Sequence, residues 1–151
     1  MHLGDLTRPD LIFPALPGSD QPTVLRAMAE RLAATSVTDD ADKLYSRLWE
    51  REELGTTAIG SGVAIPHCKM DGLDQVVVAI GLSTKGVDFQ AEDGELVRLL
   101  FLVLSPDNAP AAHLQSLAAI SKWVKTDRHV EELLEMEDAQ TIFEALKQEE
   151  V

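Results

Sequence analysis

The sequence predicts a β-sheet covered by helices, in a chain of the α/β or α+β class. Two apolar segments in the middle of the chain have the residue pattern of strands. Segments with the amphipathic repeat of helices occur both before and after them. Because a sheet buries its apolar faces against other elements, this arrangement favours a helix-covered sheet. The order of the strands does not follow from the pattern.

Length and composition indicate one globular domain, which we expect to span residues 1–151. A chain of 151 residues has the usual size of one domain and is long enough to bury a substantial core. Apolar residues make up 45% of the chain, which is a normal globular share. Proline and glycine are scattered rather than gathered in a linker, so no domain boundary is predicted.

Two helices are predicted before the strands, over residues 19–35 and 39–55. In the first, apolar residues recur at every fourth position from Val24 to Leu32, which gives the helix one apolar face. Gly55 stands at the end of the second, where glycine commonly terminates a helix. Short polar residues at both starts favour N-caps. The candidates are Ser19 or Asp20 for the first helix and Asp39 or Asp40 for the second.

Two strands are predicted over residues 72–83 and 96–106. The first contains a β-branched run from Val76 to Ile80, which is typical of a strand. The second is more continuously apolar and ends at Pro106. A strand that is covered on both faces has this pattern.

Three helices are predicted after the strands, over residues 107–125, 127–136 and 138–148. Their apolar residues follow the helical repeat, and Asn108 is the candidate N-cap of the first. The predicted apolar side of that first helix consists of Leu114, Leu117, Ile120 and Val124.

Charge and cysteine content argue against nucleic-acid binding and against a disulfide-stabilised protein. Thirteen Lys and Arg against 26 Asp and Glu give a formal net charge of −13, which repels a phosphate backbone and disfavours nucleic acid as a partner. The same charge favours a basic protein partner. The single cysteine, Cys68, permits no intramolecular disulfide. With no signal peptide and no apolar run of about 20 residues, we expect a cytoplasmic protein without membrane insertion.

The segment GSGVAIPHCKM, residues 60–70, places His67 after a short apolar run and a proline. Pro66 fixes the chain direction, and Gly60 and Gly62 permit backbone conformations that side chains forbid. An imidazole presented in this way is a nucleophile toward phosphorus near neutral pH, since its unperturbed pKa is about 6.5. The alternative interpretation is a loop histidine that is packed for structural reasons.

Arginine and hydroxyl side chains accompany this histidine. Arg51, in the last turn of the helix predicted over 39–55, has the planar fork that clamps phosphoryl oxygens. Alternatively, it complements the dipole at the helix end. Thr56, Thr57 and Ser61 supply hydroxyl donors, or take part in ordinary turns.

His113 is a second imidazole, close to the predicted apolar side of its helix. It either donates to a phosphoryl oxygen near His67 or is a packed, hydrogen-bonded histidine. The spacing of His67, Cys68 and His113 matches no standard zinc pattern, so we expect neither a metal nor another cofactor. A Cys68–His67 nucleophile pair is disfavoured because adjacent residues rarely point at each other.

The motifs around His67 are Arg51-Glu52, Gly55-Thr56-Thr57 and the run from Gly60 through Ile65-Pro66-His67. Together they resemble the active-site segment of the phosphotransferase-system IIA proteins of the fructose/mannitol type, which include a nitrogen-regulatory branch. The resemblance continues through residues 87–121, where a histidine–leucine pair opens a helix, and so covers nearly the whole chain. Two departures are Cys68, where the family often has glycine or another small residue, and Gly86, where relatives often have proline.

The resemblance implies an α/β fold, a single domain with a mixed β-sheet of about five strands and helices on both sides. It implies that His67 accepts a phosphoryl group at Nε2 from the histidine-containing phosphocarrier protein. In a sugar-uptake route it would pass the group to a cysteine of a IIB protein, and in a regulatory role the group would serve as a signal. Arg51 would steady the phosphoryl group, and His113 would lie against His67. The further phosphoryl-binding and turn candidates are Thr56, Thr57, Gly60, Ser61 and Gly62.

The function expected from these features is phosphoryl transfer, with the nitrogen-regulatory branch favoured. The chain ends at Val151 without a fused IIB or IIC segment, which is typical of that branch. A sugar-specific IIA that works in uptake is the alternative within the family. The alternative of a different class is a non-catalytic binding module with the same fold. The joint presence of His67, Arg51 and His113 argues against loss of the chemistry.

Overall fold

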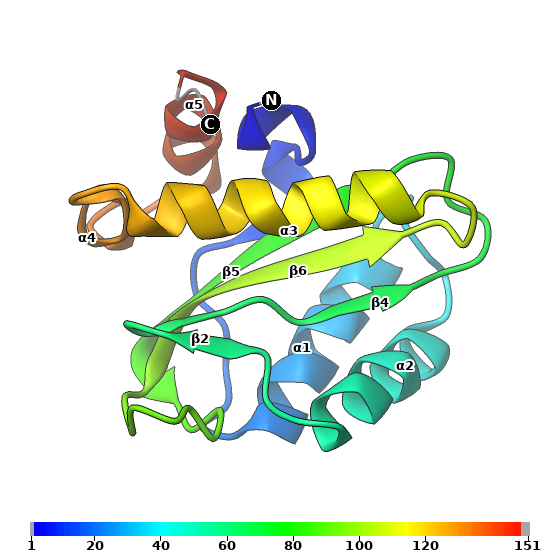
Figure 1. Ribbon diagram of the computed structural model, residues 1–151, viewed down its shortest axis with the longest axis horizontal. Helices are drawn as coiled ribbons and strands as arrows, with labels where there is room; N and C mark the ends of the chain where they lie inside the picture. Colours follow the sequence, from blue (N-terminus) through cyan, green and yellow to red (C-terminus); the bar gives the residue numbers. More distant parts are fainter. Residues whose placement is uncertain (1, 149–151) are drawn as a thin grey trace.

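The computed structural model describes residues 2–148; Met1 and residues 149–151 of the predicted domain lie outside the described part. A six-stranded sheet lies between two layers of helices (Figure 1). The long strands are β5 (Val77–Val87) and β6 (Val97–Ser105). The short strands are β1 (Ile12–Phe13), β2 (Ala58–Gly60), β3 (Val63–Ala64) and β4 (His67–Lys69). The helices are α1 (Gln21–Ala33), α2 (Ala41–Glu53), α3 (Pro110–Lys125), α4 (His129–Leu134) and α5 (Ala139–Gln148), with 3-10 turns η1 (Leu3–Asp5) and η2 (Pro9–Leu11).

The sheet is mixed, as the resemblance implied. Its strand order is β1-β5-β6-β3-β2, and β4 also pairs with β6. The β5–β6 and β2–β3 pairs are antiparallel, whereas β1 runs parallel to β5, and β3 and β4 run parallel to β6. The α/β class with helices on both sides is confirmed, and the sheet has six strands where about five were expected. The additional short strands have two or three residues each, too few to show a repeat in the sequence.

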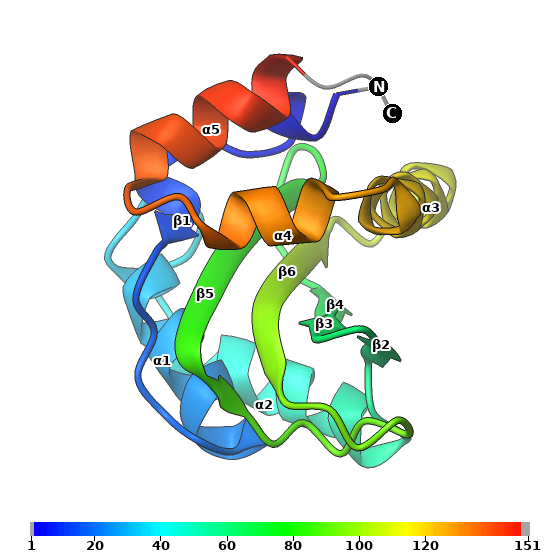
Figure 2. The same ribbon diagram turned by 90° about the vertical axis from the view of Figure 1, so that its left-hand side faces the viewer.

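Helices cover both faces of the sheet, and β6 contributes to the core on each face. Leu100 and Leu102 pack in the cluster formed with α1 and α2. Phe101 and Val103 alternate with them and pack in the opposite cluster, with residues of α3, α4 and α5. Figure 2 shows β6 beside β5, with α1 and α2 below and α4 and α5 above. The continuous apolar run predicted to be covered on both faces is therefore confirmed.

Two expectations for α3 are wrong. Its N-cap is Ala109, with no side-chain hydrogen bond, rather than Asn108. Pro110 takes the first helical position, where the missing N–H has no helical partner to lose. The side chain of Leu114 is 66% exposed instead of lying on the apolar side. Residues two apart lie about 200° apart around a helix, and the buried side passes through Ser116.

The described residues, 2–148, contain no helix that is a candidate for a membrane span. No helix there is both long and apolar enough to cross a bilayer. The longest helix, α3, has 16 residues and exposes polar side chains.

The structure selects one N-cap from each pair of candidates. The Asp20 carboxylate accepts a hydrogen bond from the Thr23 backbone N–H, and Asp40 accepts one from Lys43. We expect Asp40→Ala to lower the free energy of unfolding by about 1 kcal/mol, because a helix N–H loses its partner. Asp39→Ala is the matched control and should leave stability nearly unchanged in urea denaturation. Equal losses for the two variants would contradict the assignment of the cap.

Candidate functional site

His67 is placed by two short strands that run one after the other along β6. β3 pairs with Leu99 and Leu100, and β4 starts at His67, opposite Val103. Between them lies Pro66, which has no N–H to donate, while its carbonyl accepts a hydrogen bond from the Val103 N–H at 2.9 Å. The buried strand β6 thereby fixes the backbone position of His67.

The hydrogen bonds of the His67 ring define its tautomer. Nδ1 lies 2.8 Å from the Ile65 carbonyl oxygen, which can only accept, so Nδ1 carries the hydrogen. Nε2 accepts a hydrogen bond from Arg51 Nε at 3.3 Å. Burial lowers the pKa of His67, the bond to Ile65 opposes this shift, and the Arg51 charge lowers the pKa further. The ring is therefore neutral near pH 7, with the lone pair on Nε2.

Arg51 combines the two roles that the sequence left open. Its Nη1 donates to the Gly55 carbonyl at 2.8 Å, just beyond the end of α2. Its Nε donates to His67. The same guanidinium therefore closes a helix end and is held against the imidazole. Among residues 2–148, no protein group accepts a hydrogen bond from Nη2, which leaves donors for a ligand oxygen.

His113 lies beside His67, as the resemblance implied. The two ring centroids are 5.4 Å apart and the ring planes meet at 60°. His113 Nδ1 lies 2.5 Å from the hydroxyl oxygen of Ser105, the last residue of β6. Burial lowers the pKa of His113, and the nearby His67 and Lys69 lower it further, so this ring is also neutral near pH 7.

The two imidazoles open onto a shared hollow of about 390 Å³. Three cationic residues, one carboxylate, Glu50, and Leu54, which is 84% exposed, contribute to its lining. A second hollow, of about 230 Å³, is also lined by Arg51 and His67. The first is lined by Arg47, Glu50, Arg51, Leu54, His67, Cys68, Lys69 and His113.

Thr56 and Thr57 line the second hollow, but their hydroxyl hydrogens are already used. Thr56 Oγ1 donates to the Phe89 carbonyl, and Thr57 Oγ1 donates to the Glu52 carboxylate. Glu52 is buried, and it also accepts from the Thr57 N–H at 2.9 Å and from Gln21. Burial raises the pKa of Glu52, and the bonds to Thr57 oppose the shift. These contacts fix the loop between Arg51 and β2.

The glycine-rich segment lies away from the imidazoles. Gly60, Ser61 and Gly62 form the turn between β2 and β3, each with positive φ. The Ser61 N–H donates to Asp93 Oδ2 at 3.0 Å. None of the three lines either hollow that contains His67. The structure therefore brings Arg51, His67 and His113 together and gives the glycines a turn-forming place instead.

Cys68 is held in an unreactive form next to His67. Burial raises the pKa of its thiol to about 12, against which the charge of Arg47 acts weakly. Near neutral pH the thiol is therefore protonated, and the thiolate is the nucleophilic form. Within residues 2–148, no three His, Cys, Asp or Glu side chains are grouped so as to hold a metal ion.

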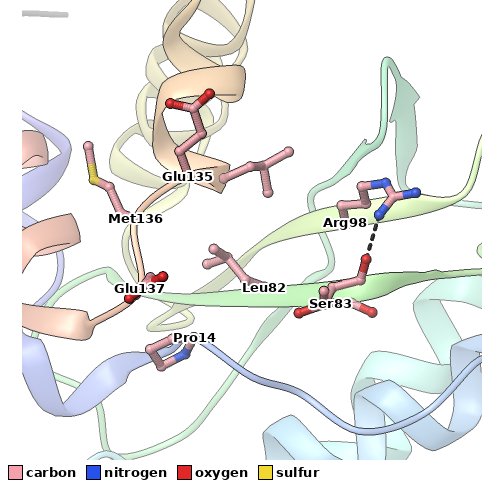
Figure 3. Close-up of a pocket in the computed structure, with 9 residues that line it drawn as sticks. Pro14, Leu82, Ser83, Arg98, Glu135, Met136 and Glu137 are labelled. Atoms are coloured by element: carbon pink, nitrogen blue, oxygen red, sulfur yellow. Dashed lines mark hydrogen bonds between the residues drawn. The ribbon is translucent and has the colours of Figure 1, made fainter.

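Another hollow, of about 440 Å³, lies elsewhere on the sheet (Figure 3). Its lining includes Leu82, Arg98 and Met136, and it shares no residue with the two hollows at His67. The Arg98 guanidinium donates to the Thr84 carbonyl. This hollow is therefore separate from the histidine site.

Comparisons with known proteins agree with this geometry. The family model described as "Phosphoenolpyruvate-dependent sugar phosphotransferase system, EIIA 2" matches residues 5–149. The fold and the match define a phosphoryl-transfer protein. The chain belongs to the EIIA type 2 family, the fructose/mannitol type of phosphotransferase-system IIA proteins, whose members interact with phosphocarrier proteins.

Three relatives illustrate the match. A nitrogen regulatory protein of Bradyrhizobium diazoefficiens is 36% identical over 97% of this chain and 95% of its own length. A phosphotransferase-system fructose-specific EIIA component of Haloferax volcanii is 40% identical over 72% of this chain and 70% of its own. The crystal structure of the nitrogen regulatory protein IIA-Ntr of Neisseria meningitidis has a TM-score of 0.85 and 27% identity, covering 95% of this chain and 98% of that one.

Acid should destabilise the protein in part through His67. Its pKa in the folded state lies below the ordinary value of 6.5, so the unfolded chain takes up this proton first as the pH falls. The stabilisation is present above pH 6.5 and is lost as the pH falls through the folded pKa. We expect the free energy of unfolding to decrease more between about pH 7.5 and 5.5 in the wild type than in His67→Gln. Parallel urea-denaturation profiles of the two proteins would contradict this assignment.

Proposed function

We propose that His67 is the phosphoryl acceptor of this EIIA protein and receives the group at Nε2 from the histidine-containing phosphocarrier protein. The single observation that carries the proposal is the state of the ring. Nδ1–H is held by the Ile65 carbonyl, which leaves a neutral Nε2 lone pair next to the Arg51 guanidinium. Neutral imidazole nitrogen is the nucleophilic form toward phosphorus.

The transfer needs no proton to move. The hydrogen bond from Arg51 Nε to Nε2 is released, and the Nε2 lone pair forms a new P–N bond while the P–N bond of the donor phosphohistidine breaks. The electron pair of the broken bond stays on the donor ring. The His67 ring then carries a formal positive charge, which Nδ1–H shares with the Ile65 carbonyl. Arg51 and the neutral ring of His113 stand at the position where the phosphoryl oxygens arrive. Phosphoryl transfer depends mainly on such positioning and charge stabilisation.

Thr56 and Thr57 serve this reaction indirectly in our proposal. Their hydrogen bonds to Phe89 and Glu52 hold the loop that follows Arg51 and lines the second hollow. The turn glycines let the chain reverse between β2 and β3 rather than bind the phosphoryl group.

Docking of a partner is supported by apolar side chains near the two imidazoles. Leu54, whose side chain lines the hollow, is 84% exposed, and Leu114 follows His113 with 66% exposure. Exposed apolar residues next to a reactive group suit a protein partner that must approach within bonding distance. The same face would serve a phosphocarrier and a recipient protein in turn.

We assign the protein to the nitrogen-regulatory type. The relative that matches almost end to end, and the structural neighbour with a TM-score of 0.85, both carry that description. In this role the phosphoryl group, of about −2 charge, changes which proteins bind the surface around His67. The phosphocarrier route places the protein in the cytoplasm. A fructose-specific EIIA is the second candidate, favoured by the 40% identity over a shorter part of the chain.

The proposal is tested by intact-mass analysis after incubation with phosphoenolpyruvate, enzyme I and the phosphocarrier. We expect the mass of one acid-labile phosphoryl group, absent in His67→Ala because the acceptor nitrogen is gone. His129→Ala is the matched control, since this half-buried histidine packs on Trp123 in α3, away from His67, and it should be labelled like the wild type. Labelling of His67→Ala would overturn the assignment. No labelling of the wild type would favour a non-catalytic binding module.

The branch is decided by adding a recipient. Transfer of the label from the phosphorylated protein to the cysteine of a fructose-type IIB protein would support the sugar-specific candidate. A stable label in the presence of that IIB protein would support the regulatory type.

Removal of the arginine should slow transfer without abolishing it. We expect Arg51→Ala to lose about 2–4 kcal/mol of transition-state stabilisation, which corresponds to a rate roughly 30- to 1,000-fold lower. Arg26→Ala is the control, because that arginine pairs with Asp42 at the surface. The rate constants are obtained by rapid-quench measurement of phosphoryl transfer. An unchanged rate in Arg51→Ala would show that the guanidinium serves the helix end alone.

A further inference from the structure

Ser105 places a hydroxyl group at the end of an apolar strand, where the sequence pattern suggests no role for a polar side chain. It ends the otherwise apolar strand β6, and its relative exposure is 0%. Its hydroxyl oxygen lies 2.5 Å from His113 Nδ1. Within residues 2–148 this is the hydroxyl's one hydrogen-bond partner. Because buried polar groups are nearly always hydrogen-bonded, we expect the Ser105 hydroxyl to form its hydrogen bond with this one partner.

The direction of this hydrogen bond follows from what each group has to offer. The hydroxyl hydrogen of Ser105 needs an acceptor, and the lone pair of His113 Nδ1 is the acceptor within reach. A neutral imidazole carries one hydrogen, so if Nδ1 accepts, Nε2 carries it. The opposite tautomer would leave the hydroxyl hydrogen buried without a partner, which is unfavourable.

The strand β6 explains why the serine and the two histidines meet. Val103 is opposite His67 in the β4–β6 pairing, and Ser105 is opposite Lys69, two residues further on. Residues two apart in a strand point to the same face. Val103 packs on the face that α3 covers, and α3 carries His113. The end of β6 therefore brings the Ser105 hydroxyl under the His113 ring.

We propose that Ser105 is a positioning residue whose hydroxyl holds His113 in the tautomer with hydrogen on Nε2, so that His113 donates to the phosphoryl group on His67. The inference rests on the proposed function of His67. The two histidines then have complementary states. His67 donates through Nδ1 and offers the lone pair of Nε2, whereas His113 accepts through Nδ1 and offers N–H at Nε2. One ring is the acceptor of the phosphoryl group, and the other stabilises its oxygens without carrying a charge that would repel Arg51.

The tautomer is measured first, on the unphosphorylated protein labelled with nitrogen-15. At a pH where both rings are neutral, we expect His113 Nδ1 to have the shift of an unprotonated, hydrogen-bonded nitrogen and Nε2 that of a protonated one. In Ser105→Ala both shifts should move toward the values of free histidine, where the two tautomers interchange. A protonated Nδ1 in the wild type, or unchanged shifts in Ser105→Ala, would overturn the assignment.

The kinetic consequence is measured with the phosphocarrier as donor. We expect the maximal transfer rate of Ser105→Ala to fall about tenfold, the lower end of the loss seen when the hydrogen bond that orients a metal-ligating histidine is removed. The phosphocarrier concentration at half-maximal rate should not change, because Ser105 is buried and cannot contact a partner. Ser105→Thr retains the hydroxyl and should restore both the nitrogen shifts and the rate. Equal rates for Ser105→Ala and the wild type would contradict the role.

Ser116→Ala is the matched control for loss of a buried serine. Ser116 lies in α3, one turn beyond Ala112, and its hydroxyl donates to the Ala112 carbonyl rather than to a histidine. It should match Ser105→Ala in any loss of thermal stability but keep the wild-type nitrogen shifts and rate. The same loss of rate in Ser116→Ala would show a general effect of packing and overturn the proposal. A wild type that gains no phosphoryl group would instead refute the proposed function, since the tautomer is measured independently.

Discussion

The hydrogen bond from His67 Nδ1 to the Ile65 carbonyl is the interaction on which the site depends. It joins residues two apart in the chain, on either side of Pro66, which separates β3 from β4 where the two strands run along β6. The Pro66 carbonyl is tied in turn to Val103 of the buried strand β6. A ring held in this way has its nucleophilic nitrogen chosen before any partner arrives, and the change left for the transfer step at Nε2 is release of the hydrogen bond from Arg51 Nε.

Much of the fold and the centre of the site follow from the sequence. The five helices were predicted with ends within a few residues of those observed, because their apolar residues follow the helical repeat. Arg51, His67 and His113 were singled out by residue type and motif, and the structure places them together. Residue types alone left a structural alternative open for each of the three, and the resemblance of the motifs to the IIA family indicated phosphoryl transfer.

The remainder depends on contacts that no local pattern records. The Ser61 hydroxyl was expected at the phosphoryl group, yet Ser61 lines neither hollow at His67. It lies in the β2–β3 turn, where its N–H donates to Asp93, 32 residues later in the chain. Glu52 was noted as a motif residue without a role. Its buried bond to Gln21 arises from the packing of α1 against α2, and its bond to Thr57 ties the loop that follows α2. For Ser105 a signal did exist, since a hydroxyl at the end of a buried apolar run requires a partner.

Charge distribution relates the site to regulation. The chain carries a net charge of −13, which led us to expect a basic partner, but the hollow at His67 is lined by three cationic side chains and one carboxylate. Arg47, Arg51 and Lys69 therefore make a local basic site on an acidic protein. A phosphoryl group of about −2 charge on His67 would neutralise most of this patch. A partner that binds this basic site would thus distinguish the phosphorylated from the unphosphorylated protein by the charge at His67, without any rearrangement of the sheet.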